Sequence, residues 1–218
     1  MARSINYNFR KNLDTTLYLV TDSTNLEEKV FLKKIQKACQ GGVTLLQLRE
    51  KERTSREFLS LAKKVMEISH RYNIPLLIDD RIDIALAVNA DGVHVGQSDI
   101  PVSIARKLLG EDKIVGATAK TVDQAQEAYS QGADYLGVGA IYPTTTKVIT
   151  VLTKVETLAE ICKAVPIKVN AIGGLNRDNI SVLEGSGIDG ICVVSAIMKA
   201  EKPFEEAESL REQVEKMR

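Results

Sequence analysis

The chain has 218 residues, of which 44% are hydrophobic and 27% charged, with 29 Lys plus Arg against 29 Asp plus Glu. This composition is typical of a globular protein with a sizeable core, and the balanced charge excludes a bulk field that would attract nucleic acid or an anionic membrane. An anion could therefore be bound only by a local cluster of basic side chains.

Short β-branched runs alternate with longer amphipathic segments along the whole chain. We expect strands, in chain order, at 17–22, 43–50, 75–79, 91–96, 113–118, 134–142, 166–174 and 189–196. We expect a helix after each of them, at 27–42, 55–72, 82–88, 102–110, 122–132, 155–165, 176–187 and 204–218. The first helix has Val30, Ile35 and Ala38 on its expected apolar face, and Ser55 is the expected N-cap of the second.

These segments make eight strand–helix units at intervals of about 25 residues. Strands that are apolar almost throughout are typical of parallel sheets covered on both faces. The pattern predicts an α/β protein with a closed (β/α)8 TIM barrel in one domain, residues 1–218, with a short N-terminal extension at about 1–15. A doubly wound open sheet is the competing architecture.

The cysteines and the N-terminal residues indicate the cellular compartment in which the protein is found. Cys39, Cys162 and Cys192 lie far apart without C-x-x-C spacing, so we expect reduced thiols rather than a disulfide framework or a zinc site. The start of the sequence is polar and charged, and no stretch approaches the roughly 20 apolar residues that span a bilayer. We expect a cytoplasmic protein without a membrane partner.

The active site of such a barrel lies at the carboxyl ends of its strands. Gln47, Arg49 and Lys51 alternate at the end of the second strand, so in extended chain they share one face, which is the inward face if the pleat continues. A solvated, charged strand end is the alternative interpretation.

Glycines and small polar residues follow the last two strands. Gly173-Gly174 and Val194-Ser195 occupy the positions where barrels of this type frequently bind phosphate, because glycine lets backbone amides approach an oxyanion closely. A tight turn that merely requires glycine is the alternative.

Two carboxylates follow neighbouring strands. Asp80 and Asp99 could share one Mg²⁺, which takes one or two carboxylates and completes its shell with water and phosphate oxygens. Each of them alone could instead cap a helix. His94 lies inside the fourth strand, where we expect a hydrogen-bonded structural histidine rather than a catalytic base.

Seven motifs in order, from about residue 17 to 203, make the chain similar to the thiamine phosphate synthase family. They are "TLLQLREK" (44–51), "IDDR" (78–81), "ADGVHVGQSD" (90–99), "GATAKT" (116–121), "DYLGVGAIYPTTTK" (134–147), "NAIGGL" (170–175) and "DGICVVSAI" (189–197). The resemblance implies a (β/α)8 barrel and a transferase of thiamine biosynthesis. It also implies Mg²⁺-dependent condensation of hydroxymethylpyrimidine diphosphate with thiazole phosphate, giving thiamine phosphate and pyrophosphate.

The resemblance also implies roles for single residues of this sequence. The pyrimidine diphosphate would be bound by Gln47, Arg49, Lys51, Asp79, Thr118 and Lys147, of which Arg49, Lys51 and Lys147 would be catalytic. The thiazole phosphate would be bound by Thr144, Thr146, Gly174, Val194 and Ser195, and magnesium by Asp80 and Asp99.

Four positions depart from the family pattern. Asp79 stands where the family favours Asn, Thr118 where it often has Ser, Ala140 where Pro is usual, and Lys154 near a usual Gly. An aspartate at position 79 can accept a hydrogen bond from the pyrimidine amino group, but it cannot donate one and adds negative charge near the diphosphate.

Two other functions remain open from the sequence. One is an isomerase similar to thiazole tautomerases, which would not need the Gln47, Arg49 and Lys51 set or the metal carboxylates. The other is a non-catalytic barrel that senses phosphorylated thiamine precursors. The sequence also leaves open a homo-oligomer and the isomer of the thiazole phosphate.

Overall fold

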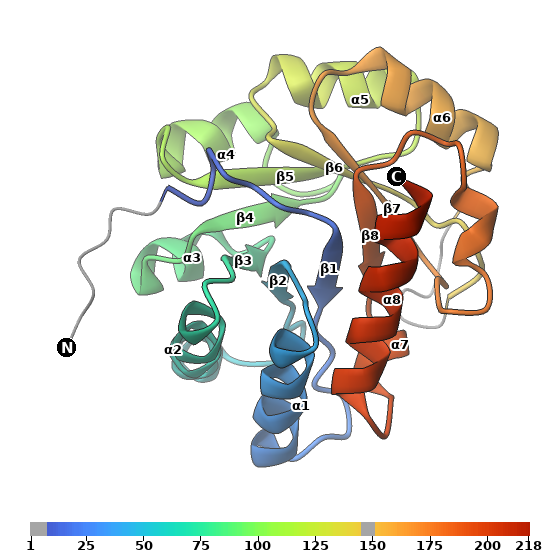
Figure 1. Cartoon of the computed structure of the whole chain (residues 1–218). Helices are drawn as coiled ribbons and strands as arrows, with labels where there is room; N and C mark the ends of the chain where they lie inside the picture. Colours follow the sequence, from blue (N-terminus) through green and yellow to red (C-terminus); the bar gives the residue numbers. More distant parts are fainter. Residues whose placement is uncertain (1–7, 145–150) are drawn as a thin grey trace.

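The computed structural model describes residues 8–144 and 151–218, and their strands form a closed barrel in which each strand pairs in parallel with the next and β8 pairs with β1 (Figure 1). The strands are β1 Leu17–Val20, β2 Leu45–Leu48, β3 Leu76–Asp79, β4 Gly92–Val95, β5 Ile114–Ala119, β6 Tyr135–Gly139, β7 Lys168–Ile172 and β8 Gly190–Val193. The predicted (β/α)8 barrel is confirmed, and the open sheet is excluded.

The helices form a ring outside the strands (Figure 1). They are α1 Glu28–Gln40, α2 Ser55–Arg71, α3 Ile82–Val88, α4 Val102–Leu109, α5 Val122–Ser130, α6 Val155–Ala164, α7 Ser195–Met198 and α8 Pro203–Met217, with one 3-10 helix, η1 Ile180–Leu183. In the part of the chain that the structure describes, no helix is long and apolar enough to cross a bilayer.

Alternation along the strands divides the core into two parts. Leu17 and Leu19 of β1 pack outward with the helices, whereas Tyr18 and Val20 pack inside the barrel. The inner cluster comprises Tyr18, Val20, Leu45, Leu77, Ile114, Tyr135 and Cys192. This cluster fills the middle of the barrel and forms the floor of any cavity that opens at the carboxyl ends of the strands.

The predicted helix over 176–187 was wrong, because only η1 forms there. Asn179 donates from Nδ2 to the carbonyl oxygen of Gly174 at 2.9 Å, and the backbone N–H of Asn176 donates to Oδ1 of Asn179 at 2.8 Å. Such side-chain bonds offer the backbone an alternative to a helix. Gly185 and Gly187, with φ of 75° and 82°, then end the segment.

Three smaller expectations also need correction. Val30 is 42% exposed, and the buried face of α1 includes Phe31 instead. Thr54, not Ser55, caps α2, through a reciprocal pair of bonds with Glu57. Strand β8 ends at Val193, so Ser195 begins the short helix α7 rather than ending a strand.

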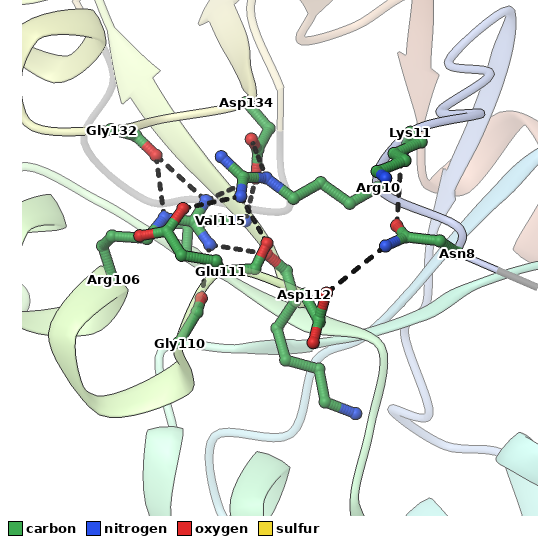
Figure 2. A network of polar contacts seen from close by, with 11 residues as sticks. Asn8, Arg10, Lys11, Arg106, Gly110, Glu111, Asp112, Val115, Gly132 and Asp134 are labelled. Atoms are coloured by element: carbon green, nitrogen blue, oxygen red, sulfur yellow. Dashed lines mark hydrogen bonds and ion pairs between the residues drawn. The ribbon is translucent and has the colours of Figure 1, made fainter. Parts of the chain in front are cut away.

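The described part of the N-terminal segment crosses the end of the barrel opposite the carboxyl ends of the strands. Figure 2 shows Arg10 between Glu111 and Asp134, with Nη1 to Oε2 of Glu111 at 2.9 Å and Nε to Oδ1 of Asp134 at 2.7 Å. The other carboxylate oxygen of Asp134 pairs with Arg106 at 2.5 Å. These ion pairs hold residues 8–14 against the turns that lead into β5 and β6.

A glycine in β5 makes room for the largest side chain of the inner cluster. A Cβ at Gly116 would lie 2.1 Å from Cζ of Tyr135, a ring that is fully buried. We expect Gly116→Ala to lower the free energy of unfolding by about 3 kcal/mol, because the ring is buried and its hydroxyl is held by hydrogen bonds to Tyr18 and His94.

Denaturant unfolding measures this change. Gly137→Ala in β6 is the matched control, since its Cβ would meet the nearest described atom, Cε1 of His94, at 3.4 Å. Equal losses of stability in the two variants would show that the contact with Tyr135 does not matter.

Candidate active site

A cavity of about 180 Å³ opens at the carboxyl ends of the strands, and all eight strands or the turns after them contribute to it. Its lining comprises Val20, Gln47, Arg49, Asp79, His94, Thr118, Lys120, Gly139, Ala140, Thr144, Ile172, Gly173, Gly174, Leu175, Cys192, Val193, Val194 and Ser195. One opening thus combines side chains that the sequence places 148 positions apart, from Gln47 to Ser195.

Gln47 and Arg49 reach the cavity from the end of β2, on the face that their alternation predicts. Asp79, the last residue of β3, lies beside them, with Oδ2 at 3.9 Å from Nε of Arg49. Lys51 follows beyond the strand, and its Nζ is 2.8 Å from Oδ2 of Asp79. Arg49 and Asp79 thus form this side of the cavity, and Lys51, which is not among the lining residues, pairs with the same carboxylate.

Lys51 also donates to Oδ2 of Asp80, so its ammonium bridges two neighbouring carboxylates. Partial burial acts against the charged form, but the hydrogen bonds to Asp79 and Asp80 outweigh it and raise the pKa of Lys51. The ammonium is firmly charged at neutral pH.

Asp80 has a left-handed backbone, with φ of 48°, which aspartate adopts more readily than most residues. Its backbone N–H donates to the carbonyl oxygen of His94 at 2.9 Å, which fixes the turn after β3 against β4. Burial raises the pKa of Asp80, the charges of Asp79 and Asp99 add to this, and the hydrogen bond from Lys51 opposes it. A further cation at Asp80 would relieve this crowding of negative charge.

Asp99 lies close enough to Asp80 to affect its pKa, but it lines a separate hollow of about 140 Å³ beside α4 and α5. Its Oδ2 accepts from the backbone N–H of Gly96 at 2.7 Å, which closes the turn after β4. Within residues 8–144 and 151–218, no group of three or more His, Cys, Asp or Glu side chains could hold a metal ion. Two carboxylates remain as candidate ligands.

The opposite side of the cavity is built from small residues. Gly173 and Gly174 have φ of 102° and 66°, and a Cβ on Gly174 would lie 2.7 Å from Cβ of Tyr142. Glycine is therefore required by both conformation and space. Val194 and Ser195, at the start of α7, and Thr144 complete this side.

Not every expected site residue can be placed. Thr146 and Lys147 lie outside the described residues. Thr118 lines the cavity from β5, and so does Lys120, which follows in the same motif but was not among the expected site residues. Nζ of Lys120 donates to the carbonyl oxygen of Val151 at 3.4 Å, so this cation links β5 to the segment before α6.

Four residues at or below the floor of the cavity are joined by hydrogen bonds that the sequence did not indicate. Tyr18, Tyr135, His94 and Thr118 come from four different strands. The expectation of a hydrogen-bonded histidine at position 94 agrees with the structure, in which Nδ1 contacts Tyr135 and Nε2 contacts Thr118.

A glycine turn and a cation-bearing strand end that open on one barrel cavity are typical of a class of protein, the α/β-barrel enzymes of phosphorylated small molecules. Comparison with known proteins gives the family. The family model described as thiamine monophosphate synthase matches residues 17–197. The chain belongs to this family.

Similar proteins cover nearly the whole chain. Proteins named thiamine-phosphate synthase from Clostridium tetani and Methanobrevibacter smithii are both 52% identical to it, over 92% and 91% of this chain and 96% and 95% of theirs. The solved structure of a thiamine phosphate pyrophosphorylase from Pyrococcus furiosus is 37% identical, with a TM-score of 0.85 over 96% of this chain and 98% of that one.

Proposed function

We propose that this chain condenses hydroxymethylpyrimidine diphosphate with thiazole phosphate to give thiamine phosphate and pyrophosphate, as a transferase of thiamine biosynthesis. Family membership supports the reaction class. The observation that carries the proposal is that Gln47 and Arg49 line the same cavity as Gly174 and Ser195. Two phosphorylated substrates could therefore meet there.

The reaction is a substitution at a CH₂ group that carries diphosphate, and the aminopyrimidine can delocalise the cation that develops as diphosphate departs. We assign Arg49, Lys51 and Lys147 to the neutralisation of the departing diphosphate, and the position of Arg49 in the cavity wall supports this role. The thiazole nitrogen attacks with its own lone pair, so the site needs no general base. The cavity walls keep water from the cation.

We assign Gln47, Asp79 and Thr118 to the pyrimidine diphosphate as well. The thiazole phosphate would be bound by Thr144, Thr146, Gly174, Val194 and Ser195. Apart from Lys51, the described members of both groups line the cavity, which supports the two assignments.

Asp80 and Asp99 would hold Mg²⁺, because both offer the hard oxygen ligands that this ion takes and because the charges of Asp79 and Asp99 both act to raise the pKa of Asp80. When bound, Mg²⁺ would neutralise charge on the leaving diphosphate. Lys51 bonds to Asp80 in the ligand-free protein, and with Mg²⁺ held by Asp80 its ammonium would be available to the diphosphate.

Asp79 offers a test of the charge balance. We expect Asp79→Asn to tighten the binding of inorganic pyrophosphate about fivefold, since Arg49 and Lys51 lose a competing carboxylate. Titration calorimetry in the presence of Mg²⁺ measures this. Weaker binding by the variant would show instead that Asp79 orients the two cations.

Pyrophosphate release tests the function itself. The purified chain, mixed with both precursors and Mg²⁺, should release pyrophosphate and form thiamine phosphate, and it should do neither when one precursor is omitted. A tautomerase or a sensor releases none. The cavity has residues for both substrates, so the site favours the synthase over these alternatives.

We further propose a cytoplasmic location and an N-terminal extension at about residues 1–15, of which residues 8–14 lie at the end of the barrel opposite the cavity. Cys39, Cys162 and Cys192 are free thiols, as in a reducing compartment. Burial raises the pKa of Cys39 to about 12 and that of Cys162 to about 11, so both remain protonated and unreactive. The contacts of Arg10 support this position of residues 8–14.

A further inference from the structure

At the floor of the cavity, five side chains from five strands form a continuous row of hydrogen bonds, which we call the polar chain. Its bonds run from Nε2 of Gln47 to Oη of Tyr18 at 2.6 Å, to Oη of Tyr135 at 2.8 Å, to Nδ1 of His94 at 2.9 Å, and from Nε2 of His94 to Oγ1 of Thr118 at 3.0 Å. Both ends, Gln47 and Thr118, line the cavity. His94 also lines the cavity, whereas Tyr18 and Tyr135 belong to the inner cluster.

Each tyrosine of the polar chain contributes one proton. Tyr18 is 1% exposed and Tyr135 is fully buried, in edge-to-face contact with ring centroids 5.6 Å apart. Burial raises the pKa of both hydroxyls well above the usual range, so both remain neutral. A neutral hydroxyl can donate once, and each of these two has contacts on both sides.

The amide of Gln47 sets the direction in which the protons point. Its Nε2 donates to Tyr18, so the proton of Tyr18 goes to Tyr135. The proton of Tyr135 then goes to Nδ1 of His94, which must be unprotonated to accept it.

The rest of the direction follows from the chemistry of imidazole. A neutral ring that accepts at Nδ1 carries its proton on Nε2, so His94 donates to Oγ1 of Thr118. The hydroxyl proton of Thr118 is then left for a partner in the cavity. At the other end, Oε1 of Gln47 is left as an acceptor.

We infer that Tyr18, Tyr135 and His94 are positioning residues that make the two ends of the polar chain chemically opposite. Gln47 presents an acceptor, which suits an amino group, and Thr118 presents a donor, which suits a phosphate oxygen. None of the three needs to touch substrate to have this effect. The use of these two ends rests on the proposed function, whereas the direction of the chain does not.

The direction can be measured in the ligand-free protein. In ¹⁵N NMR spectra of histidine-labelled protein at neutral pH, we expect His94 as the neutral tautomer with the proton on Nε2. Tyr135→Phe should produce a mixture of tautomers, because the donor to Nδ1 is lost. Tyr129→Phe removes the hydroxyl of a 45% exposed tyrosine and should leave the spectrum unchanged.

A proton on Nδ1 of His94 would overturn the inference, because that tautomer requires every bond of the polar chain to run the other way. The wild-type spectrum decides this even if Tyr135→Phe fails to fold. The spectrum also stands if the chain proves not to be a synthase.

A double-mutant cycle tests the role in binding, with inorganic pyrophosphate and Mg²⁺ as the probe. We expect Tyr135→Phe to weaken binding about fivefold, because the hydroxyl proton of Thr118 is then no longer oriented toward the cavity. In a Thr118→Val background, the same substitution should change the affinity by less than about twofold, because the group it acts through is already gone. If the losses of affinity in the two single variants added up in the double variant, Tyr135 would have only a general structural role. Thr118→Ser keeps the hydroxyl and should retain wild-type affinity.

Discussion

Replacement of Arg49 by alanine should lower turnover at least about tenfold, which corresponds to about 1.4 kcal/mol of barrier. Arg49 lies at the cavity wall beside Asp79, where its charge can neutralise a departing diphosphate. We expect the same loss for Lys147→Ala, since the family resemblance gives Lys147 the same role. Steady-state assays of pyrophosphate release measure both effects.

Arg56→Ala on the exposed side of α2 is the matched control for Arg49→Ala. It removes the same charge from the same part of the chain and should keep wild-type turnover. If Arg49→Ala also turned over at the wild-type rate, the assignment of Arg49 to the leaving group would be wrong.

Asp80→Asn should weaken metal binding and lower turnover about 100-fold at a fixed Mg²⁺ concentration. The amide keeps the size of the side chain but removes the charge that would hold the cation. Electron paramagnetic resonance with Mn²⁺ reports the affinity for metal separately from the rate. Asp83→Asn, three positions further on in α3, is the control, because Asp83 is exposed and paired with Arg81.

Turnover and Mn²⁺ affinity of Asp80→Asn test two different roles of Asp80. A lower rate with unchanged Mn²⁺ affinity would contradict the role of Asp80 as a ligand and would leave it only as a partner of Lys51. An unchanged rate and affinity would remove it from the site altogether.

The sequence predicted the barrel because its strands are nearly continuous apolar runs, each followed by an amphipathic helix. It also predicted which residues of β2 face inward, because alternation in an extended strand needs no tertiary information. Gln47 and Arg49 both line the cavity as that alternation requires.

Other features depend on contacts between distant residues and could not be read from local pattern. The bond between Tyr18 and Tyr135 spans 117 positions, and each tyrosine in its strand looked like an ordinary core residue. The helix expected over 176–187 failed because amide side chains compete for its backbone. Lys51 looked like part of an inward-facing set, but it lies past the end of β2 and turns to Asp79 and Asp80.

The bridge from Lys51 to two carboxylates means that the ligand-free barrel carries its own counter-charge. Its folding should then not depend on a supply of divalent ions. Dialysis against a chelator is expected to leave the thermal midpoint within about 1 °C of the untreated protein, because a change of a few tenths of a kcal/mol shifts it no further in a chain of this size. Purification without added magnesium salts would then yield folded apoprotein, to which Mg²⁺ can be added when the assay begins.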